Sequence, residues 1–238
     1  MSRFILICAL FGVFVISPFL RGQSAIQVEQ KAKSVRPGIN DRFKAKEMNI
    51  EEWLGRFEIE SREVFSARKQ VLQACGVKPG QRVADVGAGT GFYSRLFSNA
   101  VGKDGWVYSV DIAAPFLTHI RTKATDAKIN NLTCVLCTDR SVGLPPNSVD
   151  LVFICDTYHH FEYPQSTLAS IHRALKPEGT LVVIDFERIE GKSRKFIMGH
   201  VRAGKQVFRD EITEAGFRFE REITLPEFKE NYLLRFRK

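Results

Sequence analysis

The chain has 238 residues, of which 44% are hydrophobic and 26% are charged. A chain of this length and composition buries a substantial core, which argues against disorder throughout. Five cysteines at irregular spacings argue against a disulfide scaffold. The net charge is +8, but the basic residues are scattered among acidic ones without a long basic run, so nothing indicates a nucleic-acid-binding module.

The N-terminal residues differ from the rest of the chain. Residues 4–20 carry no charge and follow Arg3, so we expect residues 1–24 to be a signal peptide or a membrane anchor. Residues 25–48 are polar and basic, with Pro37-Gly38 in the middle, and are typical of a linker. The predicted folded domain is therefore residues 49–238.

This domain is expected to begin with helices. Asn49 and Glu52 have the spacing of a capping box, which predicts a short helix around Trp53. Apolar residues then recur at helical spacing, which predicts a longer helix from Ser61 to Cys75.

From residue 80 onwards, apolar runs alternate with helical patterns. The pattern predicts five strands, followed by two further strands near the C-terminus, at residues 82–86, 106–110, 132–136, 149–154, 180–184, 217–223 and 231–237. Helices are predicted between them at residues 92–100, 116–127, 165–175 and 210–215. Such alternation is typical of an α/β fold with a parallel sheet covered by helices on both faces.

A glycine-rich turn follows the first of these strands. Gly87, Gly89 and Gly91 alternate there, and Asp111 closes the next strand. Glycine lets a ligand approach the backbone closely, and a carboxylate at the second strand end can bind ribose hydroxyls. We therefore expect a pocket for a cofactor that contains adenosine. The dinucleotide fingerprint would need glycine at Phe92, which argues against a nicotinamide-dependent oxidoreductase.

These residues resemble a known family. The segment 83–91, with Asp85 two positions before Gly87, resembles motif I of the class I S-adenosylmethionine-dependent methyltransferases, in the domain family that includes the ubiquinone/menaquinone-biosynthesis enzymes. Residues 156–164 look like those of a subgroup of bacterial methyltransferases that often carry signal sequences. The resemblance implies a Rossmann-like, seven-stranded, mostly parallel sheet with an antiparallel C-terminal strand.

The same resemblance implies S-adenosylmethionine as cofactor and a small-molecule or lipid-like methyl acceptor. It implies cofactor contacts from residues at the strand ends, namely Asp85, Gly87, Ala88, Gly89, Gly91, Asp111, Ile112, Asp139 and Asp156. Asp111 matches the ribose-binding acid and Asp139 the acid that meets the adenine amino group. In the alternative interpretation, Asp111 only caps the next helix and Asp139 only forms a turn.

The loop after the fourth strand holds the candidate catalytic residues Tyr158, His159 and His160. Histidine titrates near neutral pH and can act as a base towards an acidic acceptor. Because the two histidines are adjacent, we expect at most one to face the pocket, and a packing role is an equal alternative for each. His119 and His172 fall within predicted helices, which favours surface or core roles for both.

Two further groups of residues are candidate ligand sites. Asp156 and Asp185 end neighbouring strands, as acids do in magnesium-dependent catechol-type methyltransferases, but Phe186 replaces a ligand, so we assign no metal. In the insert 191–207, His200, Arg202 and Lys205 are candidates for contact with an anionic acceptor.

The sequence leaves one alternative function and one question of location. A non-catalytic protein that binds S-adenosylmethionine would keep the glycine loop without turnover. The N-terminal segment indicates a bacterial cell envelope protein, either exported or associated with the membrane through residues 4–20, with the side of the membrane left open.

Overall fold

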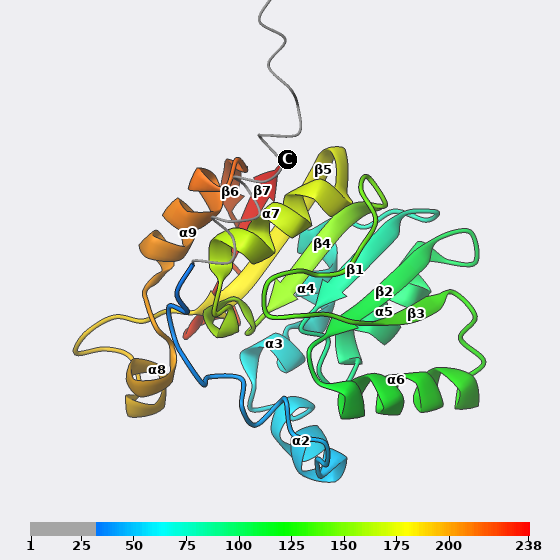
Figure 1. Ribbon diagram of the computed structural model, residues 1–238, viewed down its shortest axis with the longest axis horizontal. Coiled ribbons are helices and arrows are strands. Elements are labelled where there is room, and N and C mark those ends of the chain that lie inside the picture. Colours follow the sequence, from blue (N-terminus) through cyan, green and yellow to red (C-terminus); the bar gives the residue numbers. More distant parts are fainter. Residues whose placement is uncertain (1–31) are drawn as a thin grey trace, which may run out of the picture. The chain divides into compact units, whose positions relative to one another are not determined.

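The computed structural model describes residues 32–238, and Ser34–Lys238 form one compact unit. Within these residues, seven strands form one sheet in the order β3-β2-β1-β4-β5-β7-β6 (Figure 1). The strands are β1 (Arg82–Val86), β2 (Trp106–Asp111), β3 (Leu132–Leu136), β4 (Val149–Cys155), β5 (Leu175–Phe186), β6 (Arg218–Glu222) and β7 (Asn231–Arg237). Strands β1 to β5 are parallel, and β7 runs antiparallel between β5 and β6. The predicted fold class is confirmed.

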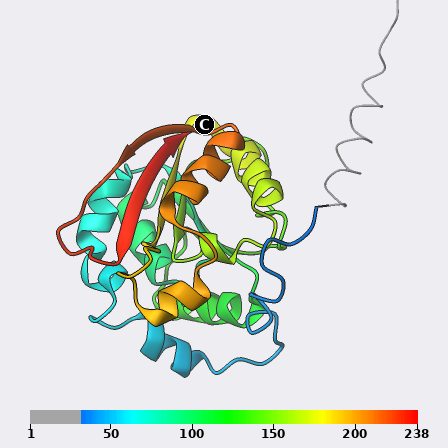
Figure 2. The same ribbon diagram turned by 90° about the vertical axis from the view of Figure 1, so that its left-hand side faces the viewer.

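Helices cover both faces of this sheet. They are α2 (Ile50–Phe57), α3 (Glu63–Ser66), α4 (Arg68–Cys75), α5 (Phe92–Val101), α6 (Ala114–Asp126), the 3-10 turn η1 (Tyr158–His160), α7 (Pro164–Ala174), α8 (Lys195–His200) and α9 (Lys205–Glu214). Helices α7 and α9 lie on one face of the sheet, and α4 and α5 lie on the other (Figures 1 and 2). Their side chains belong to the two apolar clusters on these faces. No helix among residues 32–238 is both long and apolar enough to cross a membrane.

The centre of the sheet is apolar on both sides, as the uninterrupted hydrophobic run of β4 predicts. Val152 and Ile154 face the α7 side, and Leu151 and Phe153 face the α5 side; all four are buried. This rigid centre holds the carboxyl ends of β1, β2 and β4 in fixed positions, and the polar residues gather at those ends.

The helical segment before β1 differs from the prediction. The expected helix from Ser61 to Cys75 is divided into α3 and α4 at Ala67, whose backbone leaves the helical range. The guanidinium of Arg68 donates to the carbonyl oxygen of Phe65 at 2.8 Å, which satisfies one of the acceptors freed by the break. Val64 and Val71 then pack into the same apolar cluster from two short helices.

The predicted linker is also partly wrong. Residues 34–48 belong to the compact unit, because several of their polar groups are bonded to the loop after β4. The amide of Val35 donates to the carbonyl of Glu162, and the side chain of buried Asn40 donates to the carbonyl of His160. Composition alone does not reveal such long-range contacts. The predicted signal peptide or anchor, residues 1–24, lies outside the described residues.

Candidate functional site

A cavity of about 530 Å³ opens at the carboxyl ends of the parallel strands. The strand order reverses between β1 and β4, and ligands of open α/β sheets bind at such a reversal. A smaller cavity of about 90 Å³ adjoins it, and Gly87 and Gly89 line both. The two cavities therefore share the glycine loop as a common wall.

The glycine loop requires glycine for conformation and for space. Gly87 has a φ of +76°, and a Cβ atom there would lie 2.2 Å from the side chain of Thr157. Gly91 also has a φ of +76°, and its Cβ would lie 2.6 Å from the side chain of Ile120. Residues with a side chain rarely adopt this region, so the loop depends on both glycines.

Asp111 joins the glycine loop to the start of α6. Its carboxylate accepts from the amides of Gly89 and Ala113, both at 2.8 Å, and it lines the larger cavity. Burial raises the pKa of Asp111, and hydrogen bonds from backbone amides limit the rise to about 6. A carboxylate accepts about four hydrogen bonds, so capping the helix leaves capacity for ribose hydroxyls. Its ribose-binding role remains a prediction.

Asp85 stabilises the glycine loop through a network of side-chain hydrogen bonds. Its carboxylate accepts from the hydroxyl of Ser94 at 2.6 Å, and Ser94 in turn accepts from Ser109 at 2.8 Å. Burial raises the pKa of Asp85 to about 7. Asp85 lines only the smaller cavity, as does Ala88. The buried network fixes β1, β2 and α5 around the turn.

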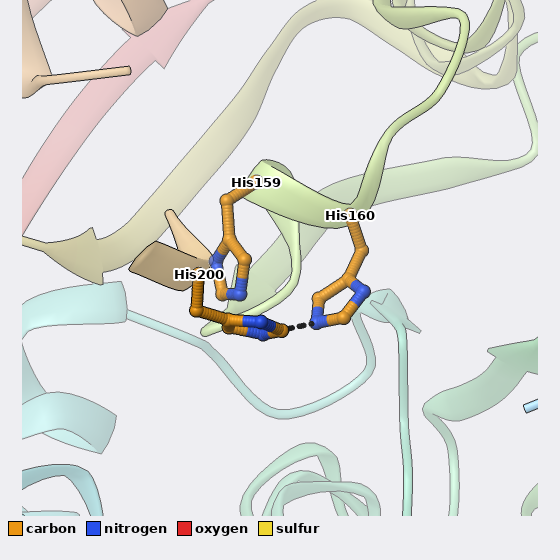
Figure 3. A group of neighbouring side chains, drawn as sticks. All are labelled: His159, His160 and His200. Carbon is orange, nitrogen blue, oxygen red and sulfur yellow. Dashed lines mark hydrogen bonds between the residues drawn. The ribbon is translucent and has the colours of Figure 1, made fainter. Parts of the chain in front are cut away.

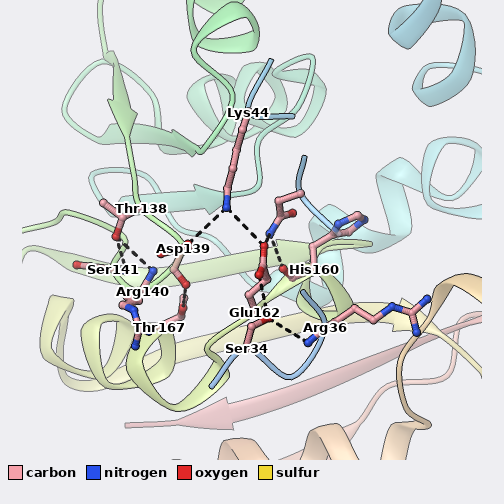
Figure 4. A network of polar contacts seen from close by, with 11 residues as sticks. Ser34, Arg36, Lys44, Thr138, Asp139, Arg140, Ser141, His160, Glu162 and Thr167 are labelled. Carbon is pink, nitrogen blue, oxygen red and sulfur yellow. Dashed lines mark hydrogen bonds and ion pairs between the residues drawn. The ribbon is translucent and has the colours of Figure 1, made fainter. Parts of the chain in front are cut away.

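Asp139 and Ile112 lie on the larger cavity, where Asp139 meets a cation. The ammonium of Lys44 lies 3.4 Å from Asp139 and 3.5 Å from Glu162 (Figure 4). Glu162 also accepts from the hydroxyl of Ser34 at 2.8 Å. This network ties residues 34–44 to the cavity wall, and the adenine contact predicted for Asp139 remains untested.

Asp156 and Asp185, the two acids at neighbouring strand ends, each accept hydrogen bonds from other groups of the protein. Asp156 lies 2.5 Å from the guanidinium of Arg62 and accepts from the side-chain amide of Asn231 at 2.7 Å. Asp185 accepts from the ring and backbone nitrogens of His159, at 2.8 Å and 3.0 Å. The assignment of no metal to this pair of acids stays a prediction. Asp156 lines both cavities, so its predicted contact with the cofactor remains open.

Both adjacent histidines line the larger cavity, and the expectation that only one would is wrong. They lie on η1, where neighbouring side chains diverge by about 120° rather than by the 180° of a strand. His200, from α8, lines the same wall. Burial, together with the neighbouring rings of His159 and His200, lowers the pKa of His160 to about 2. A general base works best with a pKa near the working pH, so this shift argues against His160 as a base.

Tyr158 does not lie on the cavity. Its side chain is fully buried against Phe208, and its hydroxyl donates to the carboxylate of Glu211 at 2.9 Å. The catalytic role predicted for Tyr158 is therefore replaced by a structural one. The 3-10 turn explains the difference, because it points Tyr158 towards α9 while the two histidines face the cavity.

Arg202 and Lys205 form ion pairs with acidic side chains away from the cavity. Arg202 makes two hydrogen bonds to Glu211, at 2.6 Å and 2.7 Å. Lys205 lies 2.5 Å from Glu187 and 2.8 Å from Glu222. Neither residue lines the cavity, so the predicted contact with an anionic acceptor is wrong for both.

An aromatic wall was missed by the sequence analysis. Phe43, Trp53, Phe57 and Phe116 pack in pairs with ring centroids 5.1 Å to 6.3 Å apart, and all four line the cavity. Trp53 and Phe57 are four residues apart on α2, and that spacing was the available signal. The wall gives this side of the cavity an apolar surface.

Comparisons with known proteins agree with this geometry. Residues 84–183 match a family described as a methyltransferase domain. The chain is 32% identical over 122 residues to the ubiquinone/menaquinone biosynthesis C-methyltransferase UbiE of Shewanella sp. (strain W3-18-1). It is 32% identical over 126 residues to the enzyme of that name from Pseudomonas syringae pv. syringae. Each match covers 49% of the relative and 51% or 52% of this chain, so the chain spans about half the length of these curated relatives.

Solved structures share the fold over a longer part of the chain. A methyltransferase from Aquifex aeolicus, described as SAM dependent, superposes with a TM-score of 0.68 at 25% identity, covering 80% of this chain and 99% of that one. The [4+2]-cyclase SpnF superposes with a TM-score of 0.62 at 16% identity, covering 73% and 80%. The second match shows the fold alone.

Proposed function

We propose that this chain transfers the methyl group of S-adenosylmethionine to a small molecule with an apolar body. The proposal rests on the class I S-adenosylmethionine-dependent methyltransferase domain that the chain contains. The observation that carries the proposal is the cavity at the strand reversal, in which the glycine loop and Asp111 adjoin the aromatic wall. A polar cofactor side and an apolar acceptor side thus share one space.

The residues of the cofactor side fit S-adenosylmethionine. Gly87 and Gly89 of the glycine loop line the cavity, and Asp111 beside them has unused acceptor capacity for ribose hydroxyls. When bound, the cofactor supplies an electrophilic methyl group on a sulfonium. The protein then mainly holds an acceptor in line with that group and keeps water out. Phe43, Trp53 and Phe57 suit the second task because they close the cavity with apolar surface.

The acceptor that we favour is quinone-like or lipid-like. Two relatives are named as ubiquinone/menaquinone biosynthesis C-methyltransferases, and the aromatic wall suits a flat or prenylated ring. Since these matches cover about half of each relative, the acceptor class remains a proposal. His159 and His160 are the predicted residues on the acceptor side.

Calorimetric titration of S-adenosylmethionine into the full-length protein tests the cofactor side. We expect micromolar binding by the wild type and at least about tenfold weaker binding by Asp111→Asn, which loses charge-assisted hydrogen bonds to ribose. Asp104→Asn is the matched control, because Asp104 is exposed and lies away from the cavity. The absence of binding by a folded wild type would contradict the proposal.

Turnover then separates the two functional hypotheses. S-adenosylhomocysteine formation, measured with quinols, phenols and extracted lipids as acceptors, is expected with at least one class. A protein that binds the cofactor tightly but transfers no methyl group across these classes would favour the non-catalytic alternative.

We also propose that residues 1–24 direct the protein to the bacterial cell envelope, either as a cleaved signal or as an anchor. The uncharged run 4–20 after Arg3 supports this proposal. Fractionation of the source cells, with N-terminal sequencing of the isolated protein, tests it. Recovery of the intact chain wholly in the cytosolic fraction would contradict it.

A further inference from the structure

Three histidines from two distant segments meet at the wall of the larger cavity. His159 and His160 come from η1, and His200 is the last residue of α8 (Figure 3). The three rings turn towards a common point, and one nitrogen from each lies within 4.8 Å of the other two. The segments are 40 residues apart in sequence, so the fold itself creates this cluster.

The spacing of two of these nitrogens suits a tetrahedral metal ion. The Nε2 atoms of His160 and His200 lie 3.3 Å apart. Tetrahedral Zn²⁺ has Zn–N bonds of about 2.0–2.1 Å, which places neighbouring ligand nitrogens about 3.3–3.4 Å apart. The pair therefore already has the separation that a shared ion requires.

The third histidine has the outer partner typical of metal-ligating histidines. Nδ1 of His159 lies 2.8 Å from the fully buried carboxylate of Asp185, which leaves Nε2 as the nitrogen that His159 offers to a ligand. Ligating histidines commonly donate their other ring N–H to a carboxylate, which fixes the ring and increases its basicity. The negative charge of Asp185 also partly offsets the charge of a cation.

Aromatic packing fixes the orientation of the other two rings. His200 stacks on Phe196 with ring centroids 5.0 Å apart, and Phe43 packs edge-on against His160. These contacts hold the rings in place.

We propose that His159, His160 and His200 bind one divalent transition metal ion, with Zn²⁺ as the preferred ion, whose fourth ligand comes from the cavity. Imidazole suits such ions, and three protein nitrogens with one open position are typical of catalytic zinc sites. The fourth ligand is an ionisable oxygen or sulfur of the acceptor, bound as its anion after its proton has left to solvent. Only this last step rests on the proposed function.

Metal titration of the untagged, full-length protein tests the site, because an affinity tag of histidines would itself bind the ion. Protein freed of metal by chelator dialysis is titrated with Co²⁺, followed by visible absorption, and then with Zn²⁺ in competition. We expect one ion per chain, with the absorption of a tetrahedral Co²⁺ centre. His200→Ala is expected to weaken Zn²⁺ binding by more than about 100-fold, and Asp185→Asn, which changes only the outer partner, by about 10- to 100-fold.

The chain provides its own controls. His119 and His172 are half-buried on helices and lie outside the cluster, so His119→Ala and His172→Ala should bind Zn²⁺ like the wild type. Far-UV circular dichroism and urea unfolding show whether His200→Ala is folded, and His160→Ala provides a second ligand variant. Absence of a saturable Co²⁺ site in the folded wild type, or wild-type affinity in folded His200→Ala and His160→Ala, would overturn the proposal.

Titration of S-adenosylmethionine into the same metal-free samples separates this proposal from the proposed function. A protein that binds the cofactor but no metal refutes the metal site alone. A protein that binds metal but not the cofactor refutes the proposed function and leaves the three-histidine site standing.

Discussion

Substitution of Gly87 by alanine tests whether the glycine loop is required for space or only for its backbone conformation. A Cβ at Gly87 would lie 2.2 Å, 2.4 Å and 2.7 Å from three side-chain atoms of Thr157, well inside van der Waals contact. Gly80 provides a matched control, because its φ of +81° is equally left-handed but no atom lies within 4 Å of a Cβ there.

The two variants separate the cost of the left-handed backbone conformation from the cost of overpacking. Placing a residue with a side chain in the left-handed region costs about 1–2 kcal/mol of stability. Alanine also makes the unfolded chain stiffer than glycine does, which offsets about 0.4–1 kcal/mol of this cost. We therefore expect Gly80→Ala to lose about 0.5–1.5 kcal/mol of unfolding free energy. Overpacking adds about 1–3 kcal/mol, so Gly87→Ala should lose about 2–4 kcal/mol.

Equilibrium urea unfolding measures both losses, and calorimetry measures the affinity for S-adenosylmethionine. Gly87→Ala should weaken cofactor binding, since Gly87 lines both cavities, whereas Gly80→Ala should leave it unchanged. Adding Thr157→Ala to Gly87→Ala should recover part of the stability, because it removes the two closest atoms. Equal losses of stability in the two glycine variants would refute the steric argument.

Two further predictions follow from buried polar groups. Burial raises the pKa of Asp85 from 3.8 to about 7, so between about pH 4 and pH 7 the folded state holds this proton more tightly than the unfolded chain does. The unfolding free energy should therefore fall as the pH rises through this window, by at most about 4 kcal/mol. Asp85→Asn should flatten this pH dependence, measured by urea unfolding. An unchanged dependence of stability on pH in Asp85→Asn would contradict the raised pKa of Asp85. Tyr158→Phe should lower the unfolding free energy by about 1.5–3 kcal/mol, because the hydrogen bond to Glu211 is lost, without changing cofactor affinity. A large loss of cofactor affinity in folded Tyr158→Phe would restore a role for Tyr158 in the site.

The elements that could be predicted from sequence are those specified by local signals. Asn49 caps α2 as predicted, accepting from the amide of Glu52, because a capping box depends on residues three positions apart. The two C-terminal strands lie close to their predicted positions, and the sheet follows from the alternation of apolar runs with helices. The placement of Asp111 beside the glycine loop follows from the strand order of such a sheet.

The acceptor side was less predictable because it depends on contacts between distant segments. His160 and His200 meet across 40 residues of sequence, and Asn40 bonds to the backbone of His160 across 120 residues. The polar composition of residues 25–48 predicted a linker, although residues 34–48 belong to the compact unit. Tyr158 was a catalytic candidate because it lies on the loop after the fourth strand, and the sequence does not show that this loop forms a 3-10 turn.

The division between matched and unmatched residues bears on how far the activity of relatives can be extended to this chain. The family match covers residues 84–183, which contain the glycine loop, Asp111 and the two adjacent histidines. The proposed acceptor side of the cavity also includes residues outside this range, among them Phe43, Trp53 and His200. The matched range therefore contains the residues proposed for the cofactor, whereas part of the proposed acceptor side lies outside it. The proposed metal site spans the boundary, since the matched domain supplies two ligands and α8 supplies the third. A relative with the same domain but no histidine at the position of His200 should bind the cofactor without retaining the metal ion.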